Sequence, residues 1–191
     1  MTLVTSAVRR SARLAAVDPT GDDVRRVLGR LAAGVTVVTS RSGSRMQGMT
    51  CSAFSRVSQK PPLVLAAIHR TARLLELLDE EPVFAASVLS EEQEATARWF
   101  ANPDRPAGRD QFAAAGWATA PISGCPLLRD SLALLDCRVQ DTHLAGDHVI
   151  VIGRVLALGW VEVGSPLVHF RGSFHGLARD PLAPLPDMSQ P

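Results

Sequence analysis

Short, β-branched apolar segments follow one another along this chain, and most are separated by turn residues rather than by helices. The strongest candidate strands are 35–39, 46–54, 63–68, 83–89, 132–139, 149–163 and 167–174. Helical spacing occurs only between groups of them, at 20–31, 71–80 and 90–100. Strands in hairpin-like succession favour an antiparallel arrangement over an alternating parallel α/β sheet. We therefore predict a mainly β fold, an antiparallel Greek-key barrel with peripheral helices.

Two of the three helical segments begin with capping signals. Thr20 with Asp23, and Ser90 with Gln93, have the spacing of a capping box. Gly34 lies where the left-handed C-terminal cap of the first helix is expected. The apolar residues of that helix share one face at helical spacing: Val24, Val27, Leu28 and Leu31.

Length and charge limit the classes of protein that fit. The 191 residues are 46% hydrophobic, with a formal net charge of +1. This composition argues against disorder, and the lack of basic excess argues against a nucleic-acid partner. No apolar stretch approaches the length of a membrane span. Three dispersed cysteines fit a reducing cytoplasm better than a disulfide framework.

The chain reads as one domain with two short tails. Residues 1–19 are rich in Arg, Ser and Ala, which predicts a flexible N-terminal extension, with a transit-peptide composition as the weaker alternative. Residues 180–191 contain four prolines and predict a Pro-rich C-terminal tail. Residues 20–179 then form the domain, in which 102–124 is a long loop of the kind that is often functional or lid-like.

Several kinds of active site are poorly supported. The histidine pairs 143/148 and 169/175 do not have the spacing of a helical zinc site, and there is no CxxC motif, so no metal is expected. A GxSxG elbow, a P-loop and a GxGxxG fingerprint are all absent. Cys137, in an apolar run, is expected in the core.

Two polar segments remain as candidates. Residues 48–55 combine a glycine with small and hydroxyl side chains, which leaves backbone N–H groups open to a flat ligand with a polar edge. Ser55, Ser58, Lys60 and Arg73 could then contact a phosphate; the alternative is a strand edge followed by a polar turn. In Gly146-Asp147-His148 the carboxylate could orient the imidazole, or the segment could be an ordinary turn.

Taken in order, these segments resemble the short-chain flavin reductases, the reductase components of two-component flavin monooxygenases. The resemblance covers about residues 20–177. Besides 34–39 and 48–58, it rests on Pro61-Pro62-Leu63-Val64-Leu65, Val88-Leu89-Ser90 with Gln93, Gly146-Asp147-His148 with Gly153, Pro166-Leu167 and Arg171-Gly172. It implies a split-barrel FMN-binding fold, usually a homodimer with flavin near the subunit interface, which reduces FMN or FAD with NADH or NADPH.

The resemblance also implies site residues. Main-chain groups of the segment 50–53 would bind the isoalloxazine and Arg73 the flavin tail, while Arg171 and Phe174 would close the site. His148 is the candidate catalytic residue, which would position the nicotinamide nucleotide. The cofactor-binding set it implies is Thr39, Thr50, Cys51, Ser52, Ala53, Ser55, Ser58, Lys60, Arg73, Arg171 and Phe174. The reduced flavin would leave for a partner monooxygenase in the cytoplasm.

Departures from the family pattern leave some choices open. Ser87 stands where Asn is common, and the C-terminal segment lacks the tyrosines that often follow Arg-Gly, because the chain contains no Tyr. The choices between FMN and FAD and between NADH and NADPH therefore stay open. Two other readings stay open as well: a non-catalytic flavin- or haem-binding module, and a pyridoxamine-phosphate-oxidase-like FMN enzyme.

Overall fold

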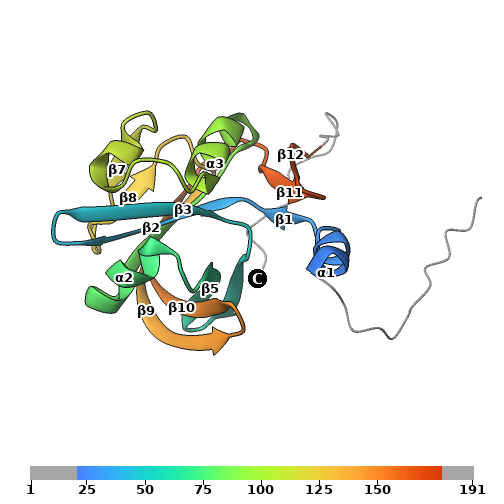
Figure 1. Ribbon diagram of the computed structural model, residues 1–191. Helices are drawn as coiled ribbons and strands as arrows, with labels where there is room; N and C mark the ends of the chain where they lie inside the picture. Colours follow the sequence, from blue (N-terminus) through green and yellow to red (C-terminus); the bar gives the residue numbers. More distant parts are fainter. Residues whose placement is uncertain (1–20, 178–191) are drawn as a thin grey trace, which may run out of the picture.

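The computed structural model describes residues 21–177, which form a mainly β fold with short helices around it (Figure 1). The Thr20 cap, the 1–19 extension and the 180–191 tail lie outside the described residues. The helices are α1 Gly21–Leu28, α2 Arg73–Glu80 and α3 Glu94–Ala101, with 3₁₀ turns η1 Glu91–Gln93 and η2 Gly108–Phe112. The strands are β1 Ala33–Gly34, β2 Thr36–Ser42, β3 Arg45–Cys51, β4 Phe54–Gln59, β5 Pro62–His69, β6 Val83–Val88, β7 Trp117–Thr119, β8 Pro126–Leu128, β9 Ala133–Ala145, β10 His148–Trp160, β11 Val168–Phe170 and β12 Ser173–His175.

Seven strands form one antiparallel sheet in the order β3-β2-β6-β9-β10-β5-β4. Its edge strands are β3 and β4, yet only Ser52 and Ala53 separate them in the chain. Three residue steps reach about 11 Å at most, so the sheet must curl until the end of β3 lies near the start of β4. The predicted mainly β, antiparallel fold is thereby confirmed, although no pairing between β3 and β4 closes the barrel among the described residues.

Strand β2 explains why the curled sheet has a core on each side. All five residues from Thr36 to Ser40 are buried. Val38 packs inside the curl with Ile68 and Phe84, in a cluster that Leu74 and Leu78 of α2 close. Val35 and Val37 face the other way, into a second cluster that contains Phe100 of α3, Phe112 and Leu128. Buried polar side chains of this strand are hydrogen-bonded as well, since the hydroxyls of Thr39 and Ser40 donate to the carbonyls of Pro126 and Val83.

Helix α1 differs from the prediction. It ends at Leu28 rather than near Leu31, and Gly34 is not a helix cap but a strand residue that pairs with Val168. None of its residues is buried, and the apolar side chains of Val27, Leu28 and Leu31 are 63%, 56% and 68% exposed. Figure 1 shows α1 at the side of the molecule, connected through β1. The apolar face is present, but nothing in the described part of this chain covers it.

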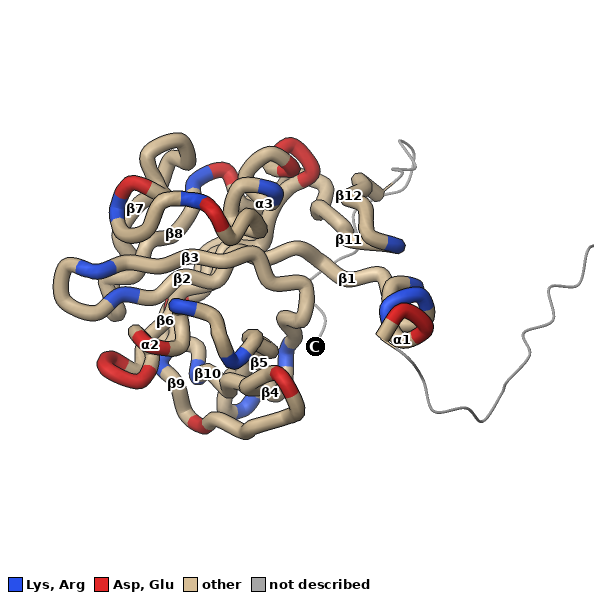
Figure 2. The backbone as a smooth tube through the Cα atoms, in the orientation of Figure 1, with Lys and Arg blue, Asp and Glu red and all other residues tan. Residues whose placement is uncertain are grey.

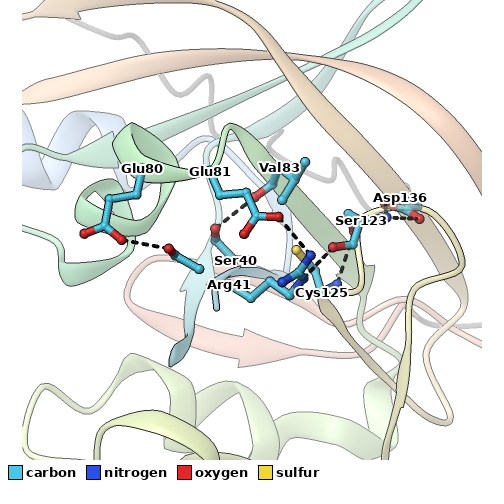
Figure 3. Close-up of polar contacts among 9 residues, drawn as sticks. Ser40, Arg41, Glu80, Glu81, Val83, Ser123, Cys125 and Asp136 are labelled. Atoms are coloured by element: carbon cyan, nitrogen blue, oxygen red, sulfur yellow. Dashed lines mark hydrogen bonds and ion pairs between the residues drawn. The ribbon is translucent and has the colours of Figure 1, made fainter. Parts of the chain in front are cut away.

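The long segment 102–124 is fixed at its C-terminal end by a network of polar contacts (Figure 3). Asp136 is 1% exposed, and its carboxylate accepts hydrogen bonds from the backbone N–H groups of Ile122 and Ser123. Arg41 donates to the Ser123 carbonyl at 2.6 Å and pairs with Glu81 at 2.8 Å. These contacts tie this end of the expected lid to β2, β9 and the end of α2, so it is a fixed part of the fold.

Charged residues of both signs are interspersed over the elements (Figure 2). No helix among residues 21–177 is long and apolar enough to cross a membrane.

Candidate functional site

A cavity of about 470 Å³ lies where β3, the start of α2 and the end of α3 meet. Thr50 and Arg73, both expected at the site, line it together. The remaining lining is apolar or neutral except for His69 and Arg105, and includes no acidic side chain. Its size and mixed character are typical of small-molecule sites. It brings Gly48, Met49 and Thr50 of the predicted 48–55 segment beside a cation, whereas residues 51–55 do not line it.

Two guanidinium groups face this cavity. Arg73 is exposed at the first turn of α2, and Arg105 is half-buried in the segment after α3. The pKa of Arg105 is lowered, chiefly because partial burial disfavours its charge and also because the positive charge of Arg73 is close. Two neighbouring cations without an acid in the same lining would be stabilised by an anion such as a phosphate.

The end of β3 and the bend to β4 contain three predicted residues, Cys51, Ser52 and Ala53, none of which lines this cavity. Cys51 is 4% exposed and packs in the inner core, where burial raises the pKa of its thiol to about 11. Such a thiol is protonated near neutral pH, so Cys51 is not a nucleophile. Ser52 and Ala53 follow as exposed residues, and the Ala53 carbonyl accepts a hydrogen bond from Ala67 N–H at 2.9 Å. One carbonyl thus anchors the bend to β5.

Three further predicted residues lie beyond the bend on or after β4. Ser55 is exposed and donates to the Arg56 carbonyl at 3.3 Å, Ser58 is half-buried, and Lys60 is exposed in the turn to β5. None of the three lines the cavity described above. Their strand was not predicted, because its polar, largely exposed side chains hide the two-residue period of a buried strand.

His148 opens β10 and is oriented by its neighbour. Its Nδ1 lies 2.6 Å from Asp147 Oδ1, and this hydrogen bond lowers the pKa of Asp147. Gly146 has a φ of +64°, so the segment forms a tight turn. The Asp147 carboxylate in this turn also orients the His148 ring. His148 pairs in register with His69, whose ring centre is 5.3 Å away. Because His69 lines the cavity, His148 stands just behind its wall.

The structure places three predicted residues elsewhere. Thr39 is fully buried in β2, and its hydroxyl donates to the Pro126 carbonyl at 2.5 Å, so in this chain it is a core residue. Arg171 sits in the turn between β11 and β12, where its N–H donates to the Gly29 carbonyl at 2.7 Å. Phe174 packs against Arg98 of α3, whose guanidinium carbon lies 5.1 Å from the ring centre. None of these residues lines the cavity within one chain.

Sequence reasoning missed Arg105, Phe100 and His69 as parts of the cavity wall. Phe100 could have been found, because it is an apolar residue near the C-terminal end of a helix that the sequence predicted. Arg105 could not, because it lies in an irregular segment whose path depends on contacts far along the chain. No group of three or more potential metal ligands occurs among residues 21–177, and the three cysteines there are buried and unpaired.

Comparison with known proteins identifies the family of this chain. A family model described as a flavin reductase like domain matches residues 28–178. The reductase subunit HsaB of a flavin-dependent monooxygenase from Rhodococcus jostii is 35% identical over 171 residues, which cover 90% of this chain and 84% of that protein. The NADH-dependent FMN reductase AsuE2 from Streptomyces nodosus subsp. asukaensis is 41% identical over 165 residues, 86% of this chain and 88% of its own.

A solved structure shows the same arrangement of strands and helices. It is the NADH:FAD oxidoreductase SgcE6 from Streptomyces globisporus C-1027, in complex with NAD and FAD fragments. Its TM-score is 0.81 at 37% identity, over 89% of this chain and 99% of that chain. The family model covers nearly all described residues, and the structural match covers 89% of this chain. This chain therefore belongs to the flavin reductase-like domain family.

Proposed function

We propose that this protein is an NAD(P)H:flavin oxidoreductase that reduces FMN or FAD by hydride transfer and supplies the reduced flavin to a partner monooxygenase. The observation that carries the proposal is the cavity, in which Thr50 of the predicted flavin segment faces two arginines and no acid. The relatives support it, since they include an NADH-dependent FMN reductase and a monooxygenase reductase subunit.

The residues present fit a phosphorylated flavin. Met49, Leu74 and Phe100 give the cavity apolar surface for a flat ring, and Arg73 with Arg105 provides positive charge for a phosphate. Backbone groups of Thr50 and the bend at Ser52 and Ala53 would hydrogen-bond the polar edge of the ring. When bound, the flavin supplies the hydride acceptor, and this chemistry belongs to the cofactor.

The protein itself would bind and orient the flavin and the nicotinamide nucleotide and would stabilise negative charge on the flavin. Backbone N–H groups of Thr50 and of the bend would stabilise negative charge on the polar edge of a bound flavin ring. His148, held by Asp147 with its Nδ1 engaged, presents the rest of its ring for the nicotinamide nucleotide. The two binding regions must hold the reacting rings about 3–3.5 Å apart for transfer to occur.

In the proposed enzyme a second copy of the chain would complete the site. Arg171 and Phe174 belong to the predicted site but lie away from the cavity of their own chain, so they would approach the cavity of a partner. The uncovered side chains of Val27, Leu28 and Leu31 provide apolar surface for a homodimer. We place the dimer in the cytoplasm, in keeping with three unpaired buried cysteines.

The proposal is tested by flavin binding to Arg73→Gln. Loss of one charge-assisted contact to phosphate should weaken FMN binding about tenfold, equivalent to about 1.4 kcal/mol. Riboflavin has no phosphate, so its dissociation constant should stay within twofold of the wild-type value. Quenching of flavin fluorescence gives both constants. Equal weakening for the two flavins, or no flavin binding by the wild-type protein, would contradict the proposal.

A further inference from the structure

Strand β3 lies at an edge of the sheet, so the backbone groups on one side of it form no hydrogen bonds with β2. Side chains and backbone groups repeat every two residues along a strand, so residues 46, 48 and 50 direct their backbone to the same open edge. An open edge is free to fray or to pair with another chain unless something covers it. In this protein the segment 102–112 covers it.

Gln111 is the main contact between that segment and the strand. Its side chain is fully buried, and its Oε1 accepts the hydrogen bond of Gly48 N–H at 2.9 Å. Its Nε2 donates to the carbonyls of Met46 at 3.1 Å and Gly108 at 2.9 Å. Its own backbone carbonyl accepts from Trp99 Nε1 of α3 at 2.7 Å. The side chain and the backbone of this one residue thus join β3, η2 and α3.

Arg105 covers the other backbone group of Gly48. Its Nη2 donates to the Gly48 carbonyl, and its Nη1 donates to the Asn102 carbonyl at 2.6 Å. The guanidinium carbon stands 5.9 Å from the centre of the Phe100 ring. Both backbone groups of Gly48 are therefore held from the 102–112 side, while Arg105 also lines the cavity.

The contacts stop short of residues 50–53, whose main-chain groups would bind the isoalloxazine. They cover Met46 and Gly48 at the open edge, and the next residue in that row is Thr50. The Thr50 side chain is itself engaged, since its hydroxyl donates to the Ala97 carbonyl at 2.7 Å. Thr50 lines the cavity, and its position along β3 depends on how firmly the strand is held at Gly48.

We propose that Gln111 and Arg105 are positioning residues, which clamp β3 at Gly48 and thereby fix the backbone of Thr50 and the bend after it for flavin binding and hydride transfer. This inference rests on the proposed function. A preorganised backbone avoids the loss of freedom that a loose segment would suffer on binding. Loosening β3 should therefore weaken flavin binding and misplace the ring, but leave the nucleotide region around His148 unaffected.

Two variants test whether the contacts of Gln111 and Arg105 with β3 affect flavin binding. Gln111→Met keeps the volume but removes every side-chain hydrogen bond, and Arg105→Lys keeps the positive charge beside the cavity but lacks the fork that spans two carbonyls. The matched control is Arg109→Gln on η2, because Arg109 lies 5.4 Å from the Trp117 ring centre and does not line the cavity. If Gln111→Met does not fold, Arg105→Lys decides the matter with riboflavin as the ligand, because riboflavin has no phosphate for Arg105 to contact.

Three measurements are made on each variant: the flavin dissociation constant, the rate of hydride transfer at saturating flavin, and the KM for NADH. Both clamp variants should raise the dissociation constant about tenfold and slow hydride transfer several-fold, with KM for NADH within twofold of wild type. Hydrogen exchange should show faster exchange of the Gly48 amide. Arg109→Gln should match wild type in all four.

A purely structural clamp would lower the melting temperature and speed Gly48 exchange while flavin affinity and hydride-transfer rate stay within twofold of wild type; that result overturns the inference. Equal losses in Arg109→Gln would overturn it too, because they would indicate a general effect of the segment. Failure of the proposed function is distinguishable, since it would appear in the wild-type protein as an absence of flavin binding.

Discussion

Any side chain at position 48, even the methyl group of alanine, is predicted to destabilise the folded protein. A Cβ built there would lie 2.9 Å and 3.1 Å from Cε1 and Cδ1 of Phe100 and 3.3 Å from Cζ of Phe112. Both rings are 1% exposed and pack in the same cluster, so neither can move into solvent. Overpacking of this kind destabilises a core by about 1–3 kcal/mol. For a domain of this size, that lowers the melting temperature by roughly 2–12 °C.

The assay is thermal and urea unfolding of Gly48→Ala beside Gly159→Ala. Gly159 lies in β10, and a Cβ added to it would meet no atom within 4 Å, so the same change there should be neutral or slightly stabilising. The Gly48 variant should also bind flavin more weakly, because a shifted Phe100 deforms the cavity wall. Equal stability of the two variants would refute the claim that Gly48 is required by the close approach of these rings.

Two other predictions concern the nucleotide and the buried thiols. His148→Ala should raise KM for NAD(P)H at least several-fold more than KM for flavin; unchanged steady-state constants for both substrates would count against this role. Burial raises the pKa of Cys51 and Cys125 to about 11 and of Cys137 to about 12, from 9.0. Above pH 9 the unfolded chain loses these protons while the folded chain keeps them, so stability should fall as pH rises towards 11, by up to about 1.4 kcal/mol per pH unit for each thiol. Urea midpoints between pH 8 and about 10.5 measure the fall, and Cys125→Ala should make it shallower; an identical slope would show that this thiol does not contribute.

Local patterns predicted local structure well. The spacing of Ser90 and Gln93 predicted a capping box, and the structure contains it, with Ser90 N–H donating to Gln93 Oε1 at 3.1 Å. The succession of apolar runs predicted most strands of the curled sheet, because strands buried on one or both faces keep their apolar period. Strand β4 was not predicted, because its largely exposed, polar side chains do not show this apolar period.

Features that depend on distant contacts could not be read from the sequence. The apolar face of α1 was recognised, but not that the described chain leaves it uncovered. Thr39 was placed at the site by resemblance, whereas its burial follows from the packing of β8 against β2. Gln111 and Arg105 reach Gly48 across 63 and 57 residues. Nothing in their own segment indicates that contact.

The central claim is that this chain transfers hydride from a nicotinamide nucleotide to flavin. The most direct measurement is NADH and NADPH oxidation by the purified protein, followed by the loss of their absorbance, with FMN, FAD, riboflavin or no flavin added. We predict oxidation that depends on flavin and is fastest with a phosphorylated flavin, because Arg73 and Arg105 line the cavity. Oxidation no faster than the protein-free blank with every flavin and both nucleotides would contradict the account.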